Sequence, residues 1–178
     1  HIMREHEDFI PELDFILELN GDVIGNIMYT KAKLINENGT EKDILTFGPV
    51  SILPDYQRMG YGKMLLEHSF QAAMQLGYDV IVIFGSPGNY ISRGFKSCKK
   101  YNVCMENGKY PAAMMVKELF PHALDGHKWI YHDSRLWQSV RKKQNAMTIH
   151  WNLWKEAASK PGGVLYYESF FCGGIGNN

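Results

Sequence analysis

The sequence predicts an α/β domain in which helices flank a mixed, mostly antiparallel sheet. Between residues 13 and 52, apolar segments are separated by turn-forming residues, which is typical of strands joined by hairpins. Residues 60–76 then carry apolar side chains at helical spacing. In residues 79–84, every residue after the first, Asp79, is apolar. The strands and helices are therefore expected in the order β-β-β-α-β-α-β-β.

The first half of the sheet is expected to be an antiparallel meander with strands at residues 13–19, 23–35 and 44–52. Asn20-Gly21-Asp22 is typical of a tight hairpin turn, and residues 36–39 of a second turn. Gly48-Pro49 interrupts the third strand. Because proline cannot donate a ladder hydrogen bond, we expect a β-bulge there; the alternative is that the strand simply ends.

A helix is expected over residues 60–76, where apolar side chains from Tyr61 to Leu76 share one face. Gly77 follows at the place where a helix C-terminus commonly requires glycine. The run at residues 79–84 is typical of a central strand that is buried on both faces. The amphipathic helix is therefore expected to lie on the sheet.

The second half of the chain is less regular. A helical turn is expected at residues 89–93, followed by strands at residues 95–105 and 112–119 that Asn107-Gly108 would join. Beyond Pro121, we expect a helix over residues 137–158, a strand over residues 164–171 and a mobile tail over residues 173–178. We therefore divide the chain into a domain at residues 1–133 and an extension of unknown role at residues 134–178.

The composition fits a folded domain with a small-molecule ligand. Apolar residues make up 45% of the 178 residues, and 19 basic residues balance 19 acidic ones. This balance argues against nucleic acid or an anionic membrane as a bulk partner. There is no apolar run of about 18 residues, and residues 1–8 lack the apolar core of a signal peptide.

The cysteines and histidines do not predict a metal site. Cys98, Cys104 and Cys172 are odd in number and lack the spacing of metal ligands, which fits free thiols in a reducing cytoplasm. The 7 histidines are scattered, and none pairs with a cysteine or carboxylate at a ligand spacing. We therefore expect a cytoplasmic protein that needs no metal.

The most informative segment is Gln57-Arg58-Met59-Gly60-Tyr61-Gly62, which lies between a predicted strand and a predicted helix. A helix N-terminus has unpaired N–H groups and a partial positive charge, so it can bind a diphosphate. Gly60 and Gly62 would let the backbone approach the phosphate oxygens. The alternative is a glycine-rich turn before an ordinary surface helix. The spacing matches neither a P-loop nor a dinucleotide-binding motif.

Several elements in this order resemble the GNAT N-acetyltransferases. The spacing Q-x-x-G-x-G, formed by Gln57, Gly60 and Gly62, resembles the coenzyme A signature of that family. Tyr90-Ile91-Ser92-Arg93-Gly94-Phe95 resembles the family's Y-x-x-x-G-F element, and residues 111–126 resemble the closing strand of an uncharacterised bacterial subgroup. The resemblance extends from about Pro11 to Asp133 and implies a GNAT fold.

The resemblance also implies how acetyl-CoA would be bound. The pantetheine arm would pair with the backbone of the third strand, and the bulge would open a slot beside it. The pyrophosphate would sit at the helix start. The implied cofactor-binding residues are Phe47, Val50, Ile52, Gln57, Arg58, Met59, Gly60, Tyr61, Gly62, Lys63 and Asn89.

Tyr90 occupies the family position that often protonates the leaving thiolate, so the resemblance implies that it is catalytic. A backbone N–H near Val50 would donate to the thioester oxygen. The group that takes the amine proton stays open among Glu12, Asp14, Glu18 and a chain of water molecules.

Two features depart from the family pattern. GNAT members normally begin with a strand and helices that form one wall of the acceptor site, but few residues precede Leu13. The fold is therefore expected to lack the usual N-terminal strand and helix. The extension has no counterpart, and its aromatic residues suggest a packed or partner-binding appendage. Residues 164–171 could replace the missing strand, within one chain or between the chains of a homodimer.

The implied function is N-acetyltransfer from acetyl-CoA to a primary amine, on a small molecule or a protein, by direct attack. One alternative is a module that binds or senses acyl-CoA without turnover. Another is a structural or oligomerisation protein that uses the aromatic extension.

Overall fold

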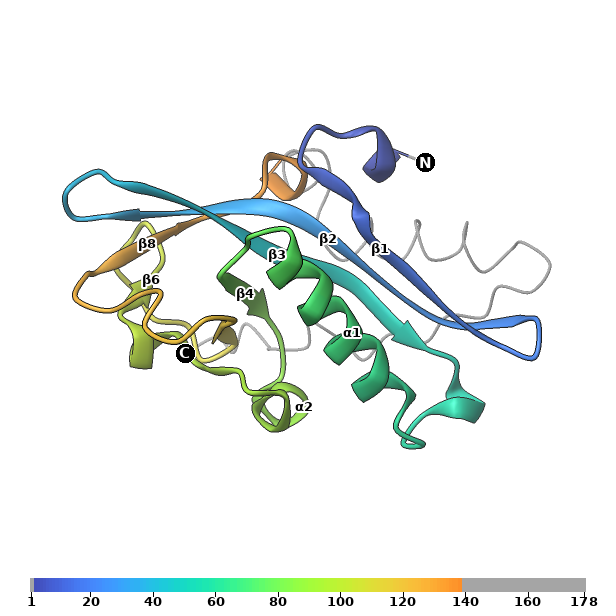
Figure 1. Ribbon diagram of the computed structural model, residues 1–178. Coiled ribbons are helices and arrows are strands. Elements are labelled where there is room, and N and C mark those ends of the chain that lie inside the picture. The colour runs from blue at the N-terminus through green and yellow to red at the C-terminus, as the bar shows by residue number, and fades with distance from the viewer. Residues whose placement is uncertain (1, 139–178) are drawn as a thin grey trace, which may run out of the picture.

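In residues 2–138, which are the part of the chain that the computed structural model describes, eight strands form a mixed sheet (Figure 1). The strands are β1 (Phe9–Leu19), β2 (Asp22–Asn36), β3 (Glu41–Ile52), β4 (Val80–Phe84), β5 (Lys96–Ser97), β6 (Val103–Cys104), β7 (Met114–Glu118) and β8 (Trp129–His132). The helices are α1 (Tyr61–Gln75) and α2 (Pro87–Tyr90), with 3-10 helices η1 (Ile2–Glu5), η2 (Pro54–Tyr56), η3 (Ile91–Arg93) and η4 (Cys98–Tyr101).

The strand order is β5-β7-β4-β3-β2-β8-β6, and β1 also pairs with β2. β1 pairs with the first part of β2, up to Thr30, and β8 pairs with residues 33–36. Because β3 takes the other edge of β2, β1 and β8 share one edge of it. Five strand pairs are antiparallel and two are parallel, which confirms the predicted mixed, mostly antiparallel sheet.

The predicted meander of the first three strands is confirmed, and each strand is longer than expected. The pairing of β1 with β2 is irregular between Phe9 and Asp14, a stretch that contains Pro11. Proline cannot donate to the ladder, so an irregularity there is expected. Asn20 and Gly21 both have positive φ, 54° and 89°, as a tight hairpin turn between β1 and β2 requires.

The predicted bulge at Gly48-Pro49 is also confirmed. Ile27 of β2 lies opposite Val50 and Tyr29 lies opposite Phe47. One residue of β2 therefore faces two residues of β3, Gly48 and Pro49, which is the pattern of a β-bulge. The strand continues to Ile52, so the alternative that it ends at Gly48 is wrong.

The single strand predicted over residues 95–105 is wrong. The segment forms two short strands, β5 and β6, separated by η4. The Oγ of Ser97 accepts a hydrogen bond from the N–H of Lys99 at 3.4 Å, and Asn102 is left-handed with φ 54°. These local hydrogen bonds and turns compete with an extended strand. The turn at Asn107-Gly108 exists, but β6 pairs with β8, which the sequence pattern did not reveal.

α1 lies on one face of the sheet, where it contacts β1, β2 and β3 (Figure 1). In β2, Ile27 and Tyr29 belong to the core cluster that includes α1. Ala32 and Leu34 belong to a second cluster, on the opposite face, together with Trp129. Side chains alternate between the faces of a strand, so β2 contributes to both clusters.

α1 ends as predicted, at a left-handed glycine. Gly77 has φ 86°, and the N–H of Tyr78 donates to the carbonyl oxygen of Ala73 at 3.1 Å. This pattern satisfies carbonyl groups that the end of a helix leaves unpaired. The chain can then turn directly into β4, whose first four residues are buried, as predicted for a central strand.

β3 and β4 diverge, which positions the site described below. They pair in parallel at one position, Leu45 with Ile81. After the bulge, β3 continues away from β4, which runs into α2 (Figure 1). Within residues 2–138, the edge of β3 from residue 47 to 52 that faces β4 therefore has no paired strand.

Residues 134–138 begin the predicted extension, and the chain is helical from Arg135 to Gln138. The predictions over residues 139–178, including the strand at residues 164–171 and the tail, lie outside the described residues. Across residues 2–138, no helix combines the length and the apolar content that crossing a membrane requires.

Candidate functional site

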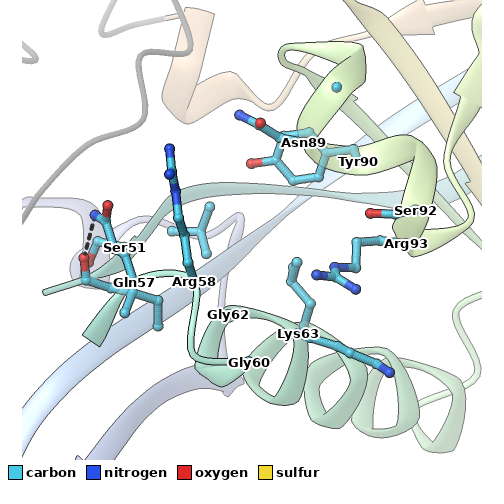
Figure 2. Close-up of a pocket in the computed structure, with 14 residues that line it drawn as sticks. Ser51, Gln57, Arg58, Gly60, Gly62, Lys63, Asn89, Tyr90, Ser92 and Arg93 are labelled. Carbon is cyan, nitrogen blue, oxygen red and sulfur yellow. Dashed lines mark hydrogen bonds between the residues drawn. The ribbon is translucent and has the colours of Figure 1, made fainter. Parts of the chain in front are cut away.

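A pocket of about 420 Å³ opens where β3 and β4 separate (Figure 2). One wall consists of the end of β3, the turn that follows it and the first turns of α1, and the other wall consists of α2 and η3. The lining residues are Val50, Ser51, Ile52, Gln57, Arg58, Gly60, Gly62, Lys63, Leu66, Gly88, Asn89, Tyr90, Ser92 and Arg93.

The first wall presents the N-terminus of α1. Gly60 is the N-cap and has φ 93°, and Arg58 in the same turn is also left-handed with φ 60°. The hydrogen bond from the N–H of Met64 to the carbonyl of Gly60, 3.0 Å long, is the first i to i−4 bond of the helix. The N–H groups before Met64 therefore have no partner within the helix, and the helix dipole makes this end electropositive.

Gln57 stabilises the turn through its side chain. Its Nε2 donates a hydrogen bond to the carbonyl oxygen of Ile52, at 3.0 Å, and its backbone N–H donates to the carbonyl of Pro54. The side chain thus ties the turn to the end of β3, as Figure 2 shows. Glutamine suits this position because its amide donates without adding charge beside the helix start.

The second wall is built around Tyr90, which has 6% of its surface exposed. Its ring centroid lies 5.9 Å from that of Phe47 and 5.7 Å from that of Phe95. Aromatic pairs at such distances contribute about 0.5–1.5 kcal/mol beyond area burial. Figure 2 shows the hydroxyl of Tyr90 on the pocket side of its ring, beside Asn89.

Lys117 of β7 fixes the backbone of η3. Its Nζ donates a hydrogen bond to the carbonyl oxygen of Arg93 at 2.9 Å, and lies 4.9 Å from the ring centroid of Phe70. Burial lowers the pKa of the Lys117 amine. Gly94, with φ 86°, follows Arg93 and ends η3. The Y-x-x-x-G-F element is therefore a turn whose backbone is held by a side chain of β7.

The charges around the pocket are of one sign. Arg58, Lys63 and Arg93 line it from three elements, and none of its 14 lining residues is an aspartate or a glutamate. Lys63 lies 3.7 Å from Glu67 on the exposed face of α1. Such a pocket, with helix N–H groups at one end, is suited to an anionic ligand.

The structure brings together most of the residues that the sequence singled out. Those that line the pocket are Val50, Ile52, Gln57, Arg58, Gly60, Gly62, Lys63, Asn89 and Tyr90. Phe47 is instead buried in the core under Tyr90, Met59 is 64% exposed, and the ring of Tyr61 packs against Tyr56. The role of each residue in cofactor binding stays a prediction.

Sequence reasoning did not select Ser51, Leu66, Gly88, Ser92 and Arg93, which also line the pocket. Ser92 and Arg93 lie inside the recognised Y-x-x-x-G-F element, so their position was a usable signal. Ser51 and Leu66 are neighbours of selected residues along β3 and α1. Which of them face the pocket depends on how the two walls pack.

None of the carboxylates considered as a base lines the pocket. Glu12 and Glu18 are exposed on β1. The Oδ2 of Asp14 accepts a hydrogen bond from the Nε of Arg4 at 2.7 Å. No carboxylate is therefore assigned as the base.

The histidines and cysteines lie elsewhere. His68 on α1 packs edge-on against Phe15, with 5.0 Å between the ring centroids. Cys98 and Cys104 are buried free thiols, and burial raises the pKa of Cys98. Within residues 2–138 no three histidine, cysteine or acidic side chains cluster as metal ligands do.

Comparison with known proteins agrees with the fold. The model of the acetyltransferase (GNAT) family matches residues 2–97. YjhQ of Escherichia coli K12, described as an uncharacterized N-acetyltransferase, is 26% identical over 96 residues, which are 54% of this chain and 52% of YjhQ. The chain thus spans about half the length of this relative.

Two solved structures share the architecture. The GNAT acetyltransferase YhbS of Escherichia coli, in complex with CoA, has a TM-score of 0.57 at 19% identity, over 66% of this chain and 64% of YhbS. A GNAT acetyltransferase from Brucella melitensis, in complex with acetyl-CoA, has a TM-score of 0.50 at 24% identity, over 68% and 66% of the two chains. The family match, the shared fold and the turn at the start of α1 show that the chain belongs to the GNAT acetyltransferase family.

Proposed function

We propose that this protein binds acetyl-CoA in the pocket between β3 and η3 and transfers the acetyl group to a primary amine. The observation that carries the proposal is the pocket itself. It is lined by three cations and no carboxylate, it begins at the N-terminus of α1, and it runs along the edge of β3 that diverges from β4. A long ligand with phosphates at one end fits this arrangement.

The phosphate end of acetyl-CoA is assigned to the start of α1. The N–H groups from Tyr61 to Lys63 would donate to the pyrophosphate, and Arg58 would add charge from the preceding turn. The pantetheine arm would extend along residues 47–52 of β3, where its amides can pair with the strand backbone as another strand would. The complexes of YhbS with CoA and of the Brucella protein with acetyl-CoA support this choice of ligand.

The acetyl group would then lie near the bulge of β3. An acceptor amine attacks the thioester carbonyl carbon, a C–N bond forms, and the C–S bond breaks to release the CoA thiolate. The N–H of Val50, directly after the bulge, would stabilise the carbonyl oxygen as it becomes negative. The hydroxyl of Tyr90 would give its proton to the thiolate, because a phenol beside the sulfur can act as a general acid. The nitrogen of the attacking amine would lose one proton to water, which leaves a neutral amide.

A second function, acyl-CoA binding or sensing without turnover, is favoured by one observation. No carboxylate lines the pocket, and this includes the three that were considered as a base, Glu12, Asp14 and Glu18. An enzyme of this kind needs a route for the amine proton, whereas a sensor does not. Only the enzyme function requires an acceptor, which would be an amine of a small molecule or of a protein.

Calorimetry and a thiol-release assay test the two functions in turn. Acetyl-CoA at 100 times its Kd should stabilise the protein by about 2.7 kcal/mol, and an absence of binding would contradict both functions. Release of CoA thiol in the presence of a panel of small amines and lysine peptides should then exceed release without amine. Tight binding of acetyl-CoA without amine-dependent release of CoA would contradict the enzyme function and favour acyl-CoA binding or sensing without turnover.

A further inference from the structure

We infer that Trp137 contacts the acceptor and selects an amine that carries an apolar or aromatic substituent. Trp137 lies in the helical segment that follows β8, and its indole stands against the bulge of β3, on the face of the sheet opposite α1. The inference rests on the proposed function and deepens it, because it names the class of acceptor and a residue that selects it.

The bulge of β3 points to the face of the sheet that α1 does not cover. Ile27 and Tyr29 of β2 belong to the core cluster that includes α1. Met28 lies between them and points to the opposite face, because side chains alternate along a strand. Met28 is the residue that lies opposite Gly48 and Pro49. The two bulge residues therefore share its face, away from α1.

The indole of Trp137 occupies this face at the bulge. A Cβ at Gly48 would lie 3.9 Å from the Cζ2 of Trp137, and within residues 2–138 no other atom outside the neighbouring residues of the chain lies within 4 Å of that position. The indole is thus in van der Waals range of the bulge, and the space next to it leaves room for a ligand. Trp137 is half-buried, so part of its ring is available for a further contact.

Hydrogen bonds hold the segment that carries Trp137, which Figure 1 shows in orange near the start of β1. The Oδ2 of Asp8 accepts hydrogen bonds from the Oγ of Ser134 at 3.1 Å and from the N–H of Arg135 at 2.7 Å. The N–H of Gln138 donates to the carbonyl oxygen of Ser134 at 3.0 Å. The backbone is therefore fixed on both sides of Trp137, and the indole has a defined place beside the bulge.

The amine has to reach the thioester from the side that the donor leaves free. In the proposed function, the pantetheine arm lies along residues 47–52 of β3 and the pyrophosphate lies at the start of α1, so acetyl-CoA fills the pocket. The nitrogen then attacks the carbonyl carbon from the opposite face of the sheet, where the indole of Trp137 stands at the bulge. The carbon atoms next to that nitrogen come into contact with the ring.

The surroundings of the indole favour an uncharged substituent on the amine. Met28, opposite the bulge, is apolar and buried. Asp14 of β1 pairs with Met28, but its Oδ2 accepts a hydrogen bond from Arg4 at 2.7 Å and its Oδ1 is closed to solvent. This carboxylate is therefore occupied and does not offer a site for a second ammonium group. An apolar or aromatic group instead gains from burying its surface against the indole.

The test is amine-dependent release of CoA thiol by the full chain at saturating acetyl-CoA, with phenethylamine, ethylamine and putrescine as acceptors. The wild type should show a kcat/KM for phenethylamine about ten- to hundredfold above that for ethylamine, which is the range of selectivity that apolar contacts give. Trp137→Ala should reduce this ratio to near one, mainly by raising the KM of phenethylamine, because the contact is made before and during the reaction. Trp137→Phe should keep part of the ratio, because it keeps an aromatic ring.

Two measurements separate a contact with the amine from a structural role. Phe120→Ala removes another exposed aromatic side chain, which does not line the pocket, and should leave the ratio as in the wild type. With CoA bound, phenethylamine should change the tryptophan fluorescence of the wild type, and Trp137→Phe should lose that change. A ratio of two amines is insensitive to a loss of folded protein, since misfolding lowers both rates equally.

Equal kcat/KM values of the wild type for phenethylamine and ethylamine, or a preference for putrescine, would overturn the inference and leave the proposed function intact. A preference for phenethylamine that Trp137→Ala does not reduce would overturn the role of Trp137. If acetyl-CoA binds but no amine increases the release of thiol, both the inference and the proposed enzyme function fall.

Discussion

At the scale of single residues, the hydroxyl of Tyr29 forms a buried polar link between β2 and α1. It shares a hydrogen bond of 2.8 Å with the Oγ of Ser69, which itself donates to the carbonyl of Leu66. Tyr29→Phe should lower the free energy of unfolding by about 1 kcal/mol, measured in urea, because Ser69 keeps its other partner. Tyr110→Phe, which removes an exposed hydrogen bond to Asn102, should have a smaller effect. Equal losses of unfolding free energy in the two variants would contradict the stabilising role of the buried Tyr29 hydroxyl.

Tyr29 should also make the stability of the protein depend on pH in the alkaline range. Burial raises the pKa of the Tyr29 phenol above its ordinary value of 10.0. Above pH 10 the unfolded chain therefore releases this proton while the folded protein keeps it, so the free energy of unfolding should fall as pH rises. Urea titrations from pH 8 to 11 should show a shallower fall for Tyr29→Phe. A fall of the same slope in both proteins would show that other groups cause it.

Tyr90 is the residue on which the proposed acid catalysis depends. Tyr90→Phe should lower kcat by about a hundredfold or more, because the phenolic proton is lost. The Kd of CoA should stay within about twofold, since a phenylalanine ring keeps the contacts with Phe47 and Phe95. Steady-state assays with saturating acetyl-CoA measure the first effect, and calorimetry measures the second. An unchanged kcat would remove Tyr90 from the mechanism.

At the scale of elements, the turn before α1 depends on Gly60 more than on Gly62. Gly60 is left-handed, with φ 93°, so Gly60→Ala should lower the free energy of unfolding by about 1–2 kcal/mol through backbone strain. A Cβ at Gly62 would lie 3.7 Å from the Cγ1 of Ile52, an ordinary contact, so Gly62→Ala should not destabilise the protein. Urea denaturation of both variants checks this. If Gly62→Ala were less stable than Gly60→Ala, contacts other than the left-handed backbone of Gly60 would determine the turn.

At the scale of the whole molecule, Asp8 joins the start of the described chain to its end. Its Oδ2 accepts hydrogen bonds from the Oγ of Ser134 at 3.1 Å and from the N–H of Arg135 at 2.7 Å. These groups lie where the chain becomes helical, so Asp8 acts there as a remote N-cap.

Asp8→Ala should therefore lower the free energy of unfolding by about 1–2 kcal/mol in urea, as the loss of a helix cap does. Glu7→Ala is the matched control, because it removes an exposed ion pair with the same Arg135, which contributes about 0.5 kcal/mol or less. If Glu7→Ala were as destabilising as Asp8→Ala, the surface ion pair would be the main connection instead.

Local patterns determined much of this fold. The apolar run of β4, the turns at Asn20-Gly21 and Gly77, and the bulge at Gly48-Pro49 follow from backbone chemistry that single residues impose. The turn at residues 57–62 and the Y-x-x-x-G-F element were recognised for the same reason, since their glycines and their spacing are local properties.

Tertiary structure alone decided the rest. β6 and β8 contain few residues each, and they are strands because β6 pairs with β8 and β8 pairs with β2, across a long stretch of sequence. Phe47 was expected beside the cofactor, which stays a prediction; its side chain lies under Tyr90, because the place of that side chain depends on how α2 packs on β3. Arg93 enters the pocket for a similar reason. Its own sequence specifies a turn, and only the position of η3 beside β7, across the pocket from α1, turns that guanidinium toward the start of the helix.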